Sequence, residues 1–243
     1  SGTGEMERHS NESNVHWFLK RATITSVVVS EGVTSISSYA FQGCSRLQHV
    51  QIPGSVTKIG YSAFKDCTNL ESINIPEGVT VIDTGAFQYC TKLKEIDLPN
   101  GLKKIGYYAF CGCQKLTDID LPESLTEIGQ SAFTGCSSLT NITIPEGVAV
   151  IEDTTFSGCS SLTSIVIPQG ATSITWGMFR GCSSLTSITI PDSVTNIGNG
   201  AFHRCSSLTS ITVPDSVNNI GDSAFSFCSS LTSITIPDSV TSI

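Results

Sequence analysis

Apolar and polar residues alternate in short segments along this chain, and each segment predicts a strand with one buried face. Residues 139–144 read Leu-Thr-Asn-Ile-Thr-Ile, which sends Ile142 and Ile144 to the same side of an extended backbone. Pro145 follows directly. Because proline has no N–H to donate to a neighbouring strand, it ends the hydrogen-bonded segment there. The pattern therefore predicts short strands, each closed by a proline and a turn.

The alternating segment recurs every 23 residues between residues 21 and 243. Nine of the ten cysteines occupy one position of this repeat, a leucine follows three residues after each, and all nine prolines share one later position. The cysteines in register are Cys44, Cys67, Cys90, Cys113, Cys136, Cys159, Cys182, Cys205 and Cys228. Residues 21–43 form a degenerate first copy, with Arg21 in place of the cysteine. An internal repeat of this length is typical of solenoids.

Each repeat also contains a second apolar pair and an Ala-Phe pair. Val148 and Ile151 indicate a second short extended or turn segment after the proline. The Ala-Phe pair begins a sequence of the form AFxxCxxL, whose Ala, Cys and Leu stand at i, i+4 and i+7. This spacing predicts one short helical turn.

A single coil of 23 residues cannot bury its own inward side chains, so neighbouring coils must stack and share one core. We therefore predict a β-rich solenoid with parallel strands on one face and short turns or helical turns elsewhere. Residues 1–20 are expected to form an N-terminal leader or capping segment, and residues 21–243 a solenoid of about ten coils, the last one truncated. At ~4.8 Å per coil the solenoid is roughly 50 Å long.

The composition agrees with a folded, hydroxyl-rich protein. Hydrophobic residues make up 39% of the chain, which excludes wholesale disorder, and charged residues only 14%, so Ser, Thr and Asn must supply the polar surface. The net charge is −8, without a run of Lys or Arg, and nucleic acid is therefore not an expected partner. The longest apolar runs are far shorter than a membrane span, so no membrane insertion is expected.

The repeat pattern CxxLxxIxIPxxVTxIGxxAFxx, seen from Cys205 to Phe225, resembles the BspA-like leucine-rich repeats of the Treponema pallidum type. The resemblance spans residues 21–243, and the leader with Trp17 is similar to the segment that precedes such arrays in secreted proteins of gut Firmicutes. It implies a right-handed leucine-rich-repeat superhelix and an extracellular or cell-surface location in gut or oral bacteria. Some relatives are adhesins, and the family has no catalytic motif to carry over.

The cysteines and histidines do not indicate an enzyme or a metal site. A constant spacing of 23 places nine cysteines in one column with no CxxC pair, which predicts a ladder of buried free thiols. Cys111 stands outside this register and is expected to be an exposed single thiol. The four histidines fall in different columns, so no nucleophilic triad is supported. We expect no catalytic residue, no metal and no cofactor.

The outward strand positions vary in the first half of the chain and are nearly uniform Thr and Ser after Cys136. Because residues in one column lie only ~4.8 Å apart, the acidic positions of two successive coils should meet on one small surface. These candidate binding residues are Glu95, Asp97, Asp118 and Asp120.

Several interpretations of these carboxylates remain open. They form a solvated face partly neutralised by lysines, a Ca²⁺ site built from carboxylate oxygens, or a contact patch for a basic partner. A glycosidase-like pair of carboxylates is the weakest alternative, because an exposed sheet has no cleft to desolvate an acid. The neutralising lysines would be Lys92, Lys94 and Lys115.

A second candidate surface is aromatic. Tyr61, Tyr107 and Trp176 occupy one repeat position, and Tyr39 and Tyr108 stand one position later. Their rings either pack over neighbouring coils or remain exposed as anchors for a protein or a sugar.

The sequence thus favours a non-catalytic extracellular module for protein interaction or adhesion, with an unidentified protein or glycan as partner. A passive structural spacer within a larger surface protein is the alternative, followed by a glycan-binding or carbohydrate-acting accessory domain. End-to-end self-association is also expected, because the truncated last coil would leave core residues partly open. These residues are Leu231, Ile234, Ile236 and Val240.

Overall fold

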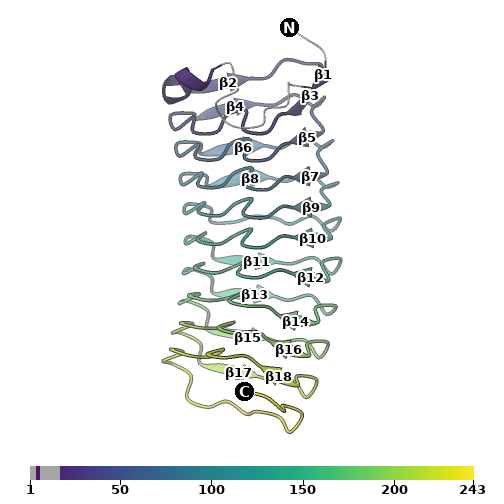
Figure 1. Cartoon of the computed structure of the whole chain (residues 1–243), viewed down its shortest axis with the longest axis vertical. Helices are drawn as coiled ribbons and strands as arrows, with labels where there is room; N and C mark the ends of the chain where they lie inside the picture. Colours follow the sequence, from purple (N-terminus) through teal and green to yellow (C-terminus); the bar gives the residue numbers. More distant parts are fainter. Residues whose placement is uncertain (1–3, 6–16) are drawn as a thin grey trace.

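The structure is a computed structural model that describes residues 4–5 and 17–243, and most of the expected leader lies outside these residues. The described chain winds into successive coils stacked along one axis, with its two ends at opposite ends of the stack (Figure 1). Residues paired between neighbouring coils are 23 positions apart, as in the pairing of Ile73 with Ile96. The prediction of a parallel β solenoid with 23-residue coils is confirmed.

The predicted strands form the first of two strand rows. Its strands pair in parallel as β2 with β4, β6 with β8, β11 with β13, and β15 with β17. Each has a buried central residue or a half-buried one between two exposed neighbours, which is the pattern expected from the alternating sequence. The bounds are β2 Ser26–Val28, β4 His49–Gln51, β6 Ser72–Asn74, β8 Glu95–Asp97, β11 Asn141–Thr143, β13 Ser164–Val166, β15 Ser187–Thr189 and β17 Ser210–Thr212.

A second strand row occupies the segment that the sequence left as extended or turn. It is the more continuous ladder, with one seven-stranded parallel sheet from β1 to β12 and a three-stranded sheet of β14, β16 and β18. The bounds are β1 Gly4–Glu5, β3 Val33–Ile36, β5 Lys58–Ile59, β7 Val81–Ile82, β9 Lys104–Ile105, β10 Glu127–Ile128, β12 Val150–Ile151, β14 Ser173–Ile174, β16 Asn196–Ile197 and β18 Asn219–Ile220. The solenoid is therefore hydrogen-bonded along two faces.

The Ala-Phe segment forms tight turns instead of the predicted helical turn. Each of these segments contains two residues in the left-handed region, such as Ser131 with φ 57° and Gly135 with φ 73°. A left-handed residue interrupts a right-handed helix, so the backbone N–H groups bond alternately within the coil and to the next coil. Gly135 N–H, for example, donates to Ser157 O at 2.7 Å. The described residues contain one 3₁₀ helix, η2 (Phe18–Thr23).

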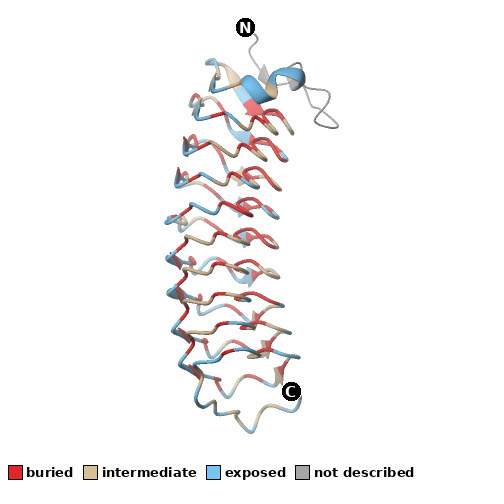
Figure 2. Cartoon of the chain, turned by 90° about the vertical axis from the view of Figure 1, so that its left-hand side faces the viewer, coloured by how far each residue is buried: buried red, intermediate tan, exposed pale blue. Residues whose placement is uncertain are grey.

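The core is a set of columns that run the length of the solenoid. The phenylalanines stack face to face, with 5.4 Å between the ring centroids of Phe64 and Phe87 and an interplanar angle of 1°. Figure 2 shows the buried positions recurring in coil after coil. At the N-terminal end Trp17 stacks on Phe41 at 5.5 Å and donates from Nε1 to Ala40 O at 2.6 Å. Trp17 therefore extends the aromatic column.

At the other end, the last coil is joined to its neighbour by the isolated bridges Thr212–Thr235 and Asn219–Ser242. Its four core-type residues are half-buried, namely Leu231, Ile234, Ile236 and Val240.

All ten cysteines are buried free thiols, as the constant spacing predicts for nine of them. The expectation for Cys111 is wrong, because this residue is only 8% exposed. Its thiol hydrogen-bonds with the side chain of Gln88, which occupies the same position one coil earlier. Stacked coils bring equivalent positions so close that a long side chain covers a short one, and this burial raises the pKa of the Cys111 thiol.

Candidate functional site

The four acidic residues singled out from the sequence line one open groove on the first strand row. Glu95 and Asp97 point outward on β8 on either side of buried Ile96, and Asp118 and Asp120 do the same around Ile119 in the next coil. The groove has a volume of about 410 Å³. The structure therefore brings all four carboxylates to one surface, and all four remain exposed.

The groove lies at one of several interruptions of the first strand row, which is also unpaired between β4 and β6 and between β13 and β15. Within the described residues no β-bridge joins residues 118–120 to β8 on one side or to β11 on the other. A second, smaller depression of about 160 Å³ flanks the same segment and is lined by Asp120 and Glu123. Like charges directly opposite each other disfavour strand pairing, and at this interruption Asp97 and Asp120 share one column. Charge does not explain every interruption, because β13 and β15 are unpaired and carry no acidic residue.

The lysines expected to neutralise this surface bond elsewhere. Lys94 Nζ lies 3.0 Å from Glu71 Oε2, and Lys92 Nζ donates to Asn69 Oδ1 at 2.6 Å. The Lys94 ammonium lowers the pKa of Glu71. In the described part of the chain, none of the four groove carboxylates forms an ion pair. Lys92 and Lys94 therefore contact residues other than the groove carboxylates, and the interpretation of a solvated, partly neutralised face stays a prediction.

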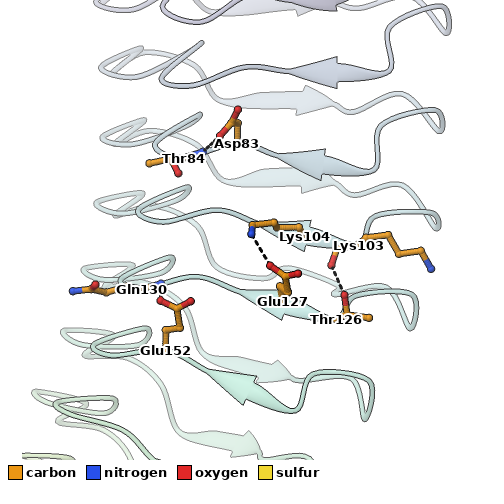
Figure 3. A network of polar contacts seen from close by, with 8 residues as sticks. All are labelled: Asp83, Thr84, Lys103, Lys104, Thr126, Glu127, Gln130 and Glu152. Atoms are coloured by element: carbon orange, nitrogen blue, oxygen red, sulfur yellow. Dashed lines mark hydrogen bonds and ion pairs between the residues drawn. The ribbon is translucent and has the colours of Figure 1, made fainter.

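The second strand row, in contrast, balances its charges between coils. Figure 3 shows Lys104 of β9 donating to Glu127 of β10, with 2.6 Å between Nζ and Oε2. This pairing raises the pKa of Lys104. In the same region Gln130 N–H donates to Glu152 Oε2 at 3.2 Å. Carboxylates of this second row thus have partners in neighbouring coils, whereas no such contact is seen for the four groove carboxylates in the described chain.

The structure gives no support to the Ca²⁺ alternative. Among the described residues no group of three or more His, Cys, Asp or Glu side chains is arranged to hold a metal ion. The four carboxylates line the groove from two successive coils. The arrangement is suited to several separate contacts with cationic groups along a partner.

The aromatic candidates do not form one continuous surface. Tyr61, Tyr107 and Trp176 are 41%, 45% and 49% exposed, but coils with polar residues at the same position separate them. The Tyr61 ring packs edge to face with Tyr39, with 5.1 Å between the centroids. Tyr107 lies over Gly129, where an added Cβ would meet its ring. The ring-packing interpretation therefore describes Tyr61 and Tyr107.

One exposed cluster was missed at the level of sequence. Phe227 is 69% exposed and lies beside Arg204 and His203 on the turns between the Ala-Phe segment and the first strand row. A signal was present, since Arg180 and Arg204 are the only Lys or Arg residues after Lys115. Without coordinates, nothing showed that these residues meet.

Comparisons with known proteins place this geometry in a family. The family model described as BspA type leucine rich repeat region (6 copies) matches residues 14–140 and 126–243. The chain belongs to the BspA-type leucine-rich repeat family. A search of the curated proteins finds no match.

Solved structures of leucine-rich repeat proteins share the fold. A leucine-rich repeat protein from Bacteroides ovatus is 28% identical with a TM-score of 0.72, covering 90% of this chain and 82% of its own. The T. pallidum leucine-rich repeat protein is 29% identical with a TM-score of 0.57, and the coverages are 84% and 83%. The pneumococcal vaccine antigen PcpA, 20% identical, has a TM-score of 0.62 over 90% of this chain and 62% of its own.

The search for a membrane-spanning helix among the described residues was negative.

Proposed function

We propose that this BspA-type solenoid is a non-catalytic extracellular or cell-surface module that binds a protein partner through the acidic groove of Glu95, Asp97, Asp118 and Asp120. The observation that carries the proposal is the groove that gathers four exposed carboxylates, none of which forms an ion pair in the described chain. The resemblance to surface proteins and adhesins of the BspA-like type supports the location.

The charge of the groove selects the kind of partner. A chain with net charge −8 attracts cationic surfaces at long range, and adjacent unpaired carboxylates concentrate this attraction in one place. The partner is accordingly a protein with a lysine- or arginine-rich segment. Because exposed charges are screened by salt, the association weakens as ionic strength rises.

A passive spacer is the second candidate function. It is favoured by the outward positions of β15 and β17, which are Ser187 and Thr189 in one strand and Ser210 and Thr212 in the next. A surface that repeats the same small hydroxyl residues offers no distinctive feature for recognition. The spacer and the binding module therefore differ in whether the acidic groove has a ligand.

The test is binding to a panel of purified host matrix proteins by biolayer interferometry at low and physiological salt. The groove variant carries Glu95→Gln, Asp97→Asn, Asp118→Asn and Asp120→Asn. The control removes the same charge at four exposed positions outside the groove, with Asp192, Asp215, Asp222 and Asp238 each changed to Asn. We expect at least tenfold weaker binding for the groove variant alone. Equal losses of affinity in both variants would mean that net charge alone attracts the partner and that the groove is not the binding site. Absence of binding by the unmodified chain would favour the spacer.

A further inference from the structure

The second half of the chain contains very few cations, and they gather in one place. After Lys115 there are eleven Asp and Glu residues but only two Lys or Arg residues, Arg180 and Arg204, and one histidine, His203. Arg180 and His203 occupy the same repeat position in neighbouring coils, and Arg204 follows directly. Backbone hydrogen bonding joins the two coils here, with Gly181 N–H donating to His203 O at 2.8 Å. All the basic side chains of this acidic half therefore lie on one edge of the solenoid.

The positive charges of this edge act on one another. The pKa of His203 is lowered by desolvation and by the nearby charges of Arg180 and Arg204. Arg180 and Arg204 form no ion pair with a carboxylate of the described chain, and two unpaired guanidinium groups on one edge favour the approach of an anion.

An exposed aromatic ring completes the edge. Phe227 occupies the position of Arg204 one coil later and is 69% exposed. The Arg204 Cζ atom lies 5.6 Å from the Phe227 ring centroid, and the His203 ring lies edge to face with it at 5.2 Å. A phenylalanine this exposed contributes little to the core and presents most of its ring to a ligand.

The backbone of both residues is strained. Arg204 and Phe227 have φ values of 63° and 61° at a repeat position where four consecutive earlier coils have glycine. Those glycines are Gly112, Gly135, Gly158 and Gly181. Glycine adopts this conformation without strain, whereas residues with a side chain do not. The left-handed turn is common to all these coils, and Asp66 and Tyr89 adopt it at the same position, so what distinguishes Arg204 and Phe227 is the side chain that each presents outward.

Serine hydroxyls line the rest of the site. Ser183, Ser206 and Ser229 line a shallow groove of about 480 Å³ with Arg204 and Phe227. Each hydroxyl donates its proton to a backbone carbonyl of the preceding coil, as Ser229 Oγ does to Ser206 O at 3.3 Å. The oxygen of each hydroxyl thus keeps lone pairs that accept hydrogen bonds from a ligand.

We propose that this edge is a binding site for a carboxylate-bearing sugar of a glycan chain. The Arg204 guanidinium pairs with the sugar carboxylate, the Phe227 ring stacks on the apolar C–H face of the pyranose, and the serine oxygens accept from its hydroxyls. The eleven acidic residues of the same half repel long polyanions, which favours a single carboxylate over a phosphate chain. The site lies several coils from the acidic groove and does not rest on the proposed function.

The test is titration of the whole chain with defined oligosaccharides, followed by saturation-transfer NMR. Two probes carry the carboxylate from different sources, an oligogalacturonate and an N-acetylneuraminate-terminated trisaccharide, and a neutral galacto-oligosaccharide and heparin are controls. Arg204→Gly and Phe227→Gly remove the side chains while placing at this position the glycine that earlier coils have. Tyr89→Gly is the matched control, because Tyr89 is an exposed aromatic residue at the same repeat position.

We expect at least one carboxylate sugar to bind, and the responding probe identifies its source. Binding should be at least tenfold weaker in Arg204→Gly and Phe227→Gly and unchanged in Tyr89→Gly. Circular dichroism should show the same fold in all variants. The proposal is overturned by binding of neither acidic sugar, by equal binding of the neutral sugar, by heparin binding that exceeds both, or by full binding in the two site variants.

Discussion

The thiol of Cys136 donates a hydrogen bond to the backbone carbonyl of Phe110, with 3.2 Å between Sγ and the oxygen. The same carbonyl accepts from Cys113 N–H at 3.1 Å, within its own coil. One oxygen therefore joins two consecutive coils. The arrangement repeats from Cys67 to Cys228, with distances of 3.1 to 3.3 Å. The repeated cysteine is thus a small buried side chain that also satisfies a carbonyl.

The buried thiols should resist modification in the folded protein. Burial raises the pKa of Cys44 to about 11 and that of Cys159 to about 12, so very little thiolate is present at pH 8. We expect an aromatic disulfide reagent to label all ten cysteines only after denaturation. If the native protein rapidly released one equivalent of the reagent's thiolate, and mass spectrometry placed the label on Cys111, the buried position of that residue would be contradicted.

The same thiols should make the protein unstable at alkaline pH. An unfolded cysteine ionises near pH ~8.5, whereas the folded chain keeps these thiols protonated, because their folded pKa is raised. The folded state then binds more protons, so stability is fully present below pH ~8.5 and falls as pH rises. Above pH ~8.5 the free energy of unfolding falls by about 1.4 kcal/mol per pH unit for each buried thiol, until the pH reaches the pKa of that thiol in the folded state.

Urea unfolding at pH 7, 9 and 10 measures this loss. In the control variant Cys136→Ser and Cys159→Ser, two titrating groups are replaced by hydroxyls that retain a donor, so the pH dependence should be shallower. Identical pH dependences in the variant and the unmodified chain would rule out the thiols as the cause.

The left-handed turns predict which glycines are required. Gly135 has φ 73° but has no close neighbour that a Cβ would meet, so Gly135→Ala tests the backbone conformation alone. We expect a loss of about 1 kcal/mol in the free energy of unfolding. Gly54→Ala is the control, because Gly54 has open space around it and its φ is not positive. The free energy of unfolding of this variant should be nearly unchanged. Equal effects of the two substitutions would disprove the explanation.

The phenylalanine column should be the main source of packing energy between coils. Phe133 is fully buried, with ring centroids of Phe110 and Phe156 at 5.4 and 5.7 Å. Phe133→Ala should lower the free energy of unfolding by about 3 to 5 kcal/mol. Phe227→Ala, at an exposed ring, should change it by less than about 1 kcal/mol. Thermal unfolding followed by circular dichroism compares Phe133→Ala with Phe227→Ala. Similar losses in the free energy of unfolding would mean that the buried phenylalanine column is not the main source of packing energy.

The last coil should exchange its amide hydrogens faster than the coils before it. Residues 228–243 have isolated bridges in place of strands, and their core-type side chains are only half-buried. Backbone hydrogen bonds open more easily where little apolar surface holds them. Hydrogen exchange read by mass spectrometry should show this at micromolar concentration, and slow exchange throughout these residues in a monomeric sample would contradict it.

The amino-acid sequence by itself determined the period, the columns and the strand register. A strict spacing of 23 leaves one alignment of successive coils that keeps Ile73 beside Ile96 and Cys113 beside Cys136, because a shift of one residue would turn every inward side chain outward. The acidic surface followed from the same reasoning, since Asp97 and Asp120 share a column. Repetition makes such inferences possible without knowledge of the tertiary fold.

Only the tertiary structure decided the properties that depend on backbone conformation and on distances between coils. Ser131 adopts a left-handed φ although its residue type does not favour it, because the stacked coils impose the same turn at every level. Cys111 is buried because Gln88 in the coil before it covers the thiol, and the groove beside Asp118 lies where the strand row is unpaired. Arg204 and Phe227 meet because they occupy equivalent positions of two neighbouring coils. Stacking at ~4.8 Å turns residues 23 positions apart into immediate neighbours, and side-chain length and charge then decide which ones touch.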